Sequence, residues 1–86
     1  MACDHVGGPE LIAMAEEHLR EANVPESDWN MRRFRFSENL TGGMWASVVT
    51  EVERRGEKWV VTRLDRKQEP VAETGFTPIR AMSDER

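Results

Sequence analysis

The chain has 86 residues, of which 33% are charged, and a formal net charge of −4 at pH 7. This length provides one hydrophobic core, and folding at this size buries roughly 60–65% of the surface of the unfolded chain. Leu, Ile, Val and Phe account for only 17 residues, but three Trp and five Met add apolar volume. The balance favours a folded chain over a disordered one. We expect a single domain over residues 1–86, with flexible ends at 1–7 and 83–86.

Cys3 is the one cysteine, so the chain has no intrachain disulfide framework and no cysteine cluster for structural zinc. No segment approaches about 18 consecutive apolar residues, and no basic region followed by an apolar stretch opens the sequence, so we expect neither a membrane span nor a secretion signal. A reducing compartment is the simpler interpretation. The sequence therefore predicts a cytoplasmic, soluble protein that does not bind a membrane.

A helix is predicted to begin at Gly8, with Pro9 at its first position and Glu10 near its positive end. The segment 23–25, Asn-Val-Pro, should end it. Apolar side chains then share one side of the helix: Leu11, Ile12, Ala15, Leu19 and Ala22. This stripe is expected to pack on a core.

The residues after the helix predict strands. A turn at 25–28 precedes a strand over residues 29–36, whose alternation changes phase and suggests a bulge near Arg32 and Arg33. A glycine-ended loop at 37–43 follows. Residues 44–64 then predict a long hairpin, with Gly56 in a three- to five-residue loop and Val49 close to Val61.

A polar turn at 65–70 and a short strand over 71–79, interrupted by Gly75 and Pro78, complete the predicted elements. Short connections between consecutive strands favour an antiparallel meander, and one amphipathic helix must bury its stripe on one face of it. The predicted fold class is α+β, with one N-terminal helix packed on a curved four-stranded antiparallel meander sheet.

This order resembles the cystatin-like fold. Three segments are similar to cystatins: 6–9 (Val-Gly-Gly-Pro), 38–43 (Glu-Asn-Leu-Thr-Gly-Gly) and the third loop at 65–70, although the Gln-x-Val-x-Gly and Pro-Trp patterns of cystatins are missing. In cystatins these places form an edge that enters the cleft of papain-like proteases. The topology also resembles PepSY-type domains and small bacterial immunity proteins, to which residues 59–65 and Val71 are similar in pattern. A shared fold does not assign a function.

Basic and aromatic residues alternate around Arg33 and Arg35, a pattern found on nucleic-acid surfaces. The chain is acidic overall, and Glu51, Glu53 and Glu57 fall on a neighbouring strand, so cross-strand pairing is the favoured interpretation. Local basic clusters can still bind anions on an acidic protein. The residues that keep this alternative open are Arg54, Arg55, Arg63, Arg66 and Lys67.

Candidate reactive groups are few. Cys3, Asp4 and His5 bring a thiol, a carboxylate and an imidazole together, but a metal or nucleophilic site needs rigid, converging ligands. His18 lies at the border of the helical stripe, where ordinary packing is the favoured interpretation. We therefore expect no catalytic residue, no metal site and no cofactor.

Leu40, Gly42, Gly43, Met44 and Trp45 form a glycine-flexed segment that ends in large apolar side chains. Exposed aromatic residues anchor protein interfaces well, although a hairpin can need the glycines for backbone reasons alone and Trp45 can instead belong to the core.

We expect a non-catalytic protein-binding domain, of inhibitor or immunity type, that uses this segment together with Arg33 and Arg35 on a sheet face. Two alternatives stay open. One is a small-ligand-binding or enzymatic domain that uses the cup between helix and sheet, with His18 or Glu51 in a polar pocket. The other is an oligomerising structural module, which a symmetric dimer through the exposed sheet face would favour.

Overall fold

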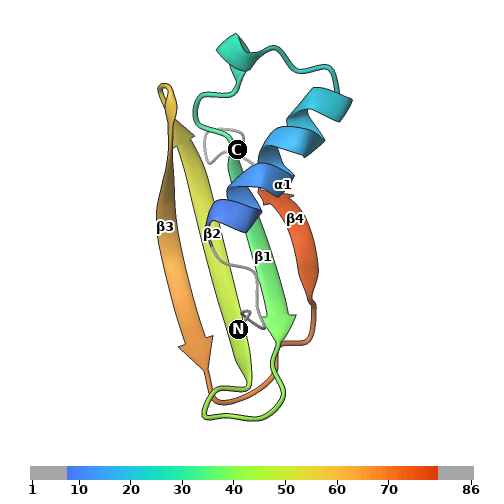
Figure 1. The fold of residues 1–86 in the computed structure, drawn as a ribbon, viewed down its shortest axis with the longest axis vertical. Helices are drawn as coiled ribbons and strands as arrows, with labels where there is room; N and C mark the ends of the chain where they lie inside the picture. Colours follow the sequence, from blue (N-terminus) through green and yellow to red (C-terminus); the bar gives the residue numbers. More distant parts are fainter. Residues whose placement is uncertain (1–7, 80–86) are drawn as a thin grey trace, which may run out of the picture.

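The structure, a computed structural model, describes residues 8–79, so the predicted flexible ends lie outside the described residues. One helix, α1 (Gly8–Glu21), lies across a four-stranded antiparallel sheet (Figure 1). A 3₁₀ turn, η1 (Glu26–Asp28), precedes the strands. The strands are β1 (Arg33–Asn39), β2 (Ser47–Arg55), β3 (Lys58–Lys67) and β4 (Gly75–Ile79). The predicted α+β class and the order of one helix followed by four strands are confirmed.

Helix α1 ends with a left-handed residue. Asn23 has φ +62°, its N–H donates to Arg20 O, and the N–H of Val24 donates to Leu19 O, both at 3.0 Å. This pair of bonds is the Schellman motif, in which asparagine can replace glycine. Val24 also packs against the core. The stop signal predicted at residues 23–25 therefore ends the helix by satisfying its last carbonyl groups.

The predicted meander is wrong in one connection. The sheet order is β3-β2-β1-β4, so β4 pairs with β1 and not with β3. This is the Greek-key order, in which the fourth strand returns to lie beside the first. Residues 68–74 make the crossing past the ends of β2 and β1, where Figure 1 shows them at the bottom. Seven residues can span about 23 Å, and three inter-strand steps need about 14 Å, so this connection is long enough to bypass two strands.

Strand β1 begins later than predicted. Trp29 precedes the strand and is buried, while Met31 has φ +70°. The change of phase near Arg32 therefore comes from a turn and not from a bulge. The bulge lies instead between β2 and β3, where Glu51 pairs with Arg63 and Val52 with Val61, leaving Thr62 as the extra residue.

The hairpin of β2 and β3 is confirmed, but its loop has only two residues. Arg55 pairs with Lys58 across Gly56 and Glu57. Gly56 has φ +63°, which fits a type II′ turn with glycine first. Val49 pairs with Asp65 and Val61 with Val52, so the predicted proximity of Val49 and Val61 is wrong. The bulge and the register place these two valines on opposite faces.

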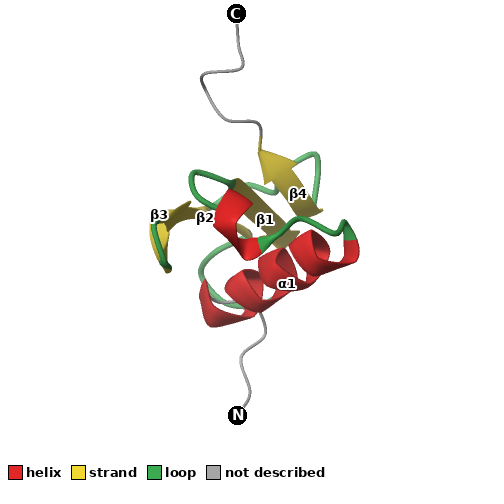
Figure 2. Ribbon diagram, turned by 90° about the horizontal axis from the view of Figure 1, so that it is seen from above, coloured by secondary structure: helices red, strands yellow, loops and turns green. Residues whose placement is uncertain are grey.

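The core lies between α1 and one face of the sheet, as the view along the sheet in Figure 2 makes clear. Its buried members are Leu11, Ala15, Leu19, Trp29, Phe34 and Val52. Phe34 stacks on Phe76 of β4, with ring centres 5.4 Å apart, and meets Trp59 of β3 edge-on at 5.9 Å. Burial of each large apolar side chain contributes about 1.5–3 kcal/mol. Aromatic rings thus compensate for the shortage of aliphatic residues.

Candidate functional site

The segment 40–46 between β1 and β2, here called the β1–β2 loop, carries five of the predicted binding residues. Gly42 and Gly43 have φ +76° and +84°, so the tip of the loop uses a backbone conformation that glycine adopts without strain. Met44 is 71% exposed and Trp45 is 36% exposed. A hollow of about 370 Å³ lies against residues 39–45. Neither the Met44 nor the Trp45 side chain belongs to the buried core.

The base of this loop is held by hydrogen bonds. Leu40 N–H donates to Ala46 O at 2.7 Å, and Ala46 N–H donates to Lys67 O at 2.8 Å. Asn39 ties the loop to the 68–74 connection, because its amide donates to Val71 O at 3.3 Å and accepts from Val71 N–H at 2.9 Å. The loop therefore presents an exposed apolar tip on a fixed base, beside the connection that leads to β4.

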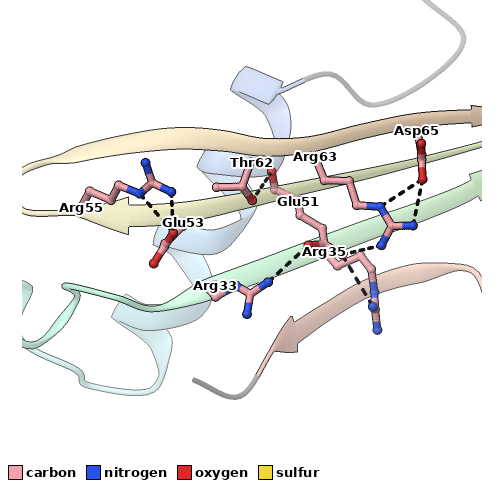
Figure 3. A network of polar contacts seen from close by, with 8 residues as sticks. All are labelled: Arg33, Arg35, Glu51, Glu53, Arg55, Thr62, Arg63 and Asp65. Carbon is pink, nitrogen blue, oxygen red and sulfur yellow. Dashed lines mark hydrogen bonds and ion pairs between the residues drawn. The ribbon is translucent and has the colours of Figure 1, made fainter. Parts of the chain in front are cut away.

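The sheet face turned away from α1, here called the open face, carries a charged cluster. Phe34 and Val52 point into the core, so the alternate residues of β1 and β2 point the other way. Figure 3 shows the resulting group on this face, with α1 behind the sheet. Its basic members are Arg33, Arg35 and Arg63, and its acidic members are Glu51 and Asp65.

Glu51 is the centre of the cluster. Its carboxylate lies 3.5 Å from Arg33 Nη2, 3.8 Å from Arg35 Nη1 and 3.2 Å from Arg63 Nη1. Its side chain is only 9% exposed, because the three arginine side chains cover it. The predicted cross-strand pairing of Arg33 and Arg35 with Glu51 is confirmed. Glu53 instead pairs with Arg55 of its own strand at 3.1 Å.

Arg63 connects this cluster to the edge of the sheet. Its Nη2 and Nε donate to Asp65 Oδ2 at 2.8 and 3.1 Å. The hydrogen bond to Asp65, followed by that to Glu51, raises the pKa of the Arg63 guanidinium against the opposing effect of desolvation. A hollow of about 230 Å³ lies beside Arg63 and Arg35, next to Ser37 and the start of β4. The open face is therefore polar and ordered by ion pairs.

Arg54 lies on the sheet face that packs against α1. The sequence pattern indicated only a place in a possible anion-binding surface, but Arg54 belongs to the edge of the core. It is 4% exposed, and its Cζ lies 5.0 Å from the ring centre of Trp29 and 5.4 Å from that of Trp59. Its Nε donates to Gly56 O at 2.9 Å and its Nη2 to Glu26 Oε2 at 3.3 Å. Arginine stacks on aromatic rings while its fork donates in plane. In the sequence, Arg54 follows Val52 by two positions, so alternation along β2 places both side chains on the core face.

The remaining candidates do not form a reactive site within the described part of the chain. His18 lies at the edge of α1 and packs its ring against Phe34 and Phe76, at 5.8 and 5.7 Å between centres, as predicted. Residues 8–79 contain no group of three or more His, Cys, Asp or Glu side chains arranged to hold a metal ion. Cys3, Asp4 and His5 lie outside the described residues.

Geometry thus defines a small α+β domain with two distinctive surfaces, the β1–β2 loop and the open face. Over residues 8–79, α1 is too short and too polar to cross a membrane. Comparison of the chain with protein-family models, curated proteins and solved structures found no match.

Proposed function

We propose that this protein is a non-catalytic protein-binding domain that occludes a macromolecular target with its β1–β2 loop, assisted by the open face. The observation that carries the proposal is the exposure of Met44 and Trp45, at 71% and 36%, on a loop whose base is fixed. Large apolar side chains are costly to leave in water unless they are packed or used for binding. Trp is a frequent interface anchor, and Met adapts its shape to a partner.

A fixed base favours binding because less conformational entropy is lost when the partner arrives. The bonds from Asn39 to Val71 and from Ala46 to Lys67 place the β1–β2 loop next to the 68–74 connection. The segments 38–43 and 65–70, two of the three that resemble the binding edge of cystatins, are therefore neighbours, although residues 65–67 belong to β3 and not to the predicted loop. This proximity supports an inhibitor or immunity-type role by steric occlusion, and the cystatin-like relationship is part of the proposal.

The alternative of a ligand cup between helix and sheet has less support. Leu11, Phe34 and Val52 are at most 2% exposed and fill the space where α1 meets the sheet. The predicted pocket residues also lie far from a common site, because His18 is on α1 and Glu51 points to the open face. An apolar, filled interface favours a structural role for this region.

A comparative pull-down from the source lysate tests the proposal. The tagged full chain, its Trp45→Ala variant and its Met31→Ala variant serve as parallel baits, followed by mass spectrometry. Met31 is the matched control because it is apolar, 55% exposed and outside the β1–β2 loop. We expect a protein that is retained by the wild type and by Met31→Ala but depleted with Trp45→Ala. Equal retention by all three baits would remove the loop from the interface.

A further inference from the structure

The two edges of the sheet differ. Strand β4 is short, with five residues, and carries Pro78, two features that protect an edge from pairing with other chains. Strand β3 has ten residues and contains no proline. It is the longest strand of the sheet and its outer side has no neighbour among the described residues. The β3 edge is therefore the one open to a further strand.

Backbone groups on this edge are available in the right places. The carbonyl of Lys67 points toward β2, since it accepts from Ala46 N–H at 2.8 Å. Backbone polar groups of successive strand residues alternate between the two sides. The N–H and C=O groups of Leu64 and Arg66 consequently point outward, away from β2. They can form a ladder with a strand that approaches from outside.

Apolar surface lies beside the same edge. Leu64 is 52% exposed and Val61 is 47% exposed, because α1 packs over β1 and β2 while β3 stands at the side of the sheet (Figure 2). Val61 pairs with Val52, and Leu64 pairs with Thr50. Both side chains therefore lie on the face that bears the helix. A strand added at this edge would cover part of this surface.

We propose that β3 pairs antiparallel with β3 of a second copy of the chain, with the two Leu64 residues opposite each other on a two-fold axis. This register places Arg63 of each subunit opposite Asp65 of the partner subunit. Both side chains lie on the open face and are 42% and 46% exposed, so they can form two cross-strand ion pairs. Opposite charges on directly facing residues stabilise an antiparallel pair.

The neighbouring symmetric registers are unfavourable. Centring the pair on Arg63, Asp65 or Arg66 would place like charges directly opposite each other, which destabilises strand pairing. Centring it on Leu64 places an apolar pair on the axis and uses the outward N–H and C=O groups of that residue. Among symmetric centres on residues 63 to 66, Leu64 is the one that avoids facing like charges, and the second copy is the partner that the charges of β3 fit.

The consequence is an eight-stranded sheet in which both helices lie on the same face and the two open faces become continuous. This association goes beyond the proposed function, because it uses neither Met44 nor Trp45. The interface formed by one pair of β3 strands is small, so we expect a reversible equilibrium between monomer and dimer and not a permanent dimer.

Sedimentation equilibrium over a concentration series tests the proposal. The average mass of the wild-type chain should rise from 9.9 kDa toward twice that value as concentration increases. Leu64→Lys should raise the dissociation constant by roughly a hundredfold, because it places like charges on the axis. Met31→Lys, at a similarly exposed apolar residue, should dimerise like the wild type. A wild-type mass of 9.9 kDa throughout, up to millimolar concentration, would overturn the proposal.

Single cysteines test the register separately. In a Cys3→Ser background, Leu64→Cys should give a disulfide-linked dimer with oxidised glutathione, since facing residues of an antiparallel ladder have Cα atoms about 5.5 Å apart. Arg66→Cys is the control, because the two substituted residues would be separated by about 13 Å along the strands. Equal cross-linking of both variants, or of neither, would contradict the proposed register.

Discussion

The guanidinium of Arg54 lies over the ring of Trp29, with 5.0 Å between Cζ and the ring centre. The pair joins the end of β2 to the segment that follows η1. Arg54 also lies 3.8 Å from a carboxylate oxygen of Glu16 on α1, which itself accepts from Trp59 Nε1 at 2.8 Å. One arginine therefore connects the helix, the 3₁₀ turn and the hairpin at one end of the core.

We predict that Arg54→Ala lowers the free energy of unfolding by about 2–4 kcal/mol, since it removes the charge-assisted hydrogen bond to Glu26 and the ring contacts with Trp29 and Trp59, and leaves Glu16 paired with Arg20 alone. Arg54→Lys should recover little, because an ammonium group cannot stack on the rings and donate in the same plane. Urea denaturation monitored by Trp fluorescence measures both. A stability within experimental error of the wild type for Arg54→Lys would show that charge alone matters here.

Glu51→Gln should lower the free energy of unfolding by about 1–3 kcal/mol, because the carboxylate that Arg33, Arg35 and Arg63 share becomes neutral. The three cations then repel one another on the open face. Glu53→Gln is the control: its partner Arg55 is 58% exposed, so the change should stay within about 0.5 kcal/mol. Chemical denaturation of the two variants side by side checks the prediction. Equal losses would mean that Glu51 is not the centre of the cluster.

Val52 and Val61 face each other across the hairpin but differ in exposure, at 0% and 47%. Val52→Asp should cost about 4 kcal/mol or more and unfold the domain, because a carboxylate would be buried without a partner. Val61→Asp should cost only about 1 kcal/mol, since its side chain remains in contact with water. Thermal unfolding followed by circular dichroism distinguishes the two variants. Unfolding of both variants would indicate that the helix side of β3 is covered.

Trp45→Ala should lower the free energy of unfolding by about 1 kcal/mol, because more than a third of Trp45 is exposed. Trp29→Ala should cost about 3–5 kcal/mol, as truncation of a buried aromatic residue does. Once a partner is identified, Trp45→Ala should weaken its binding by about 2 kcal/mol or more. Calorimetric titration and thermal unfolding of the same samples measure the two effects. A stability loss as large as that of Trp29→Ala would assign Trp45 to the core.

Local signals in the sequence predicted most elements of the fold. Gly8, Pro9 and the 23–25 segment predicted the helix, and Gly56 predicted the hairpin, because capping and turn geometry depend on a few adjacent residues. The partner of β4 could not be predicted in this way. A seven-residue connection can reach either β3 or β1, and the choice depends on packing of Phe76 against Phe34 across the sheet.

The charged cluster of the open face was predicted only in part, again because some of its contacts depend on the tertiary structure. Arg33, Arg35 and Glu51 point to the same face because side chains alternate along two neighbouring strands. The register between β1 and β2 then places Arg35 directly opposite Glu51. The participation of Arg63 depends on the bulge at Thr62, which alternation alone did not reveal. The alternation of β2 places Arg54 on the same face as Val52, but its burial also requires two tryptophan rings from separate segments, which the alternation does not indicate.

The return of β4 to β1 has a consequence for the order of folding. Arg55 pairs with Lys58, three positions along the chain, whereas Arg33 pairs with Ile79, 46 positions along. Closing the longer loop costs more chain entropy, so the β2–β3 hairpin is expected to form early and β4 to dock late. During synthesis, β1 keeps an unpaired edge, and Phe34 lacks its stacked neighbour, until Phe76 has left the ribosome. Over that interval the nascent chain is open to pairing with other chains through β1.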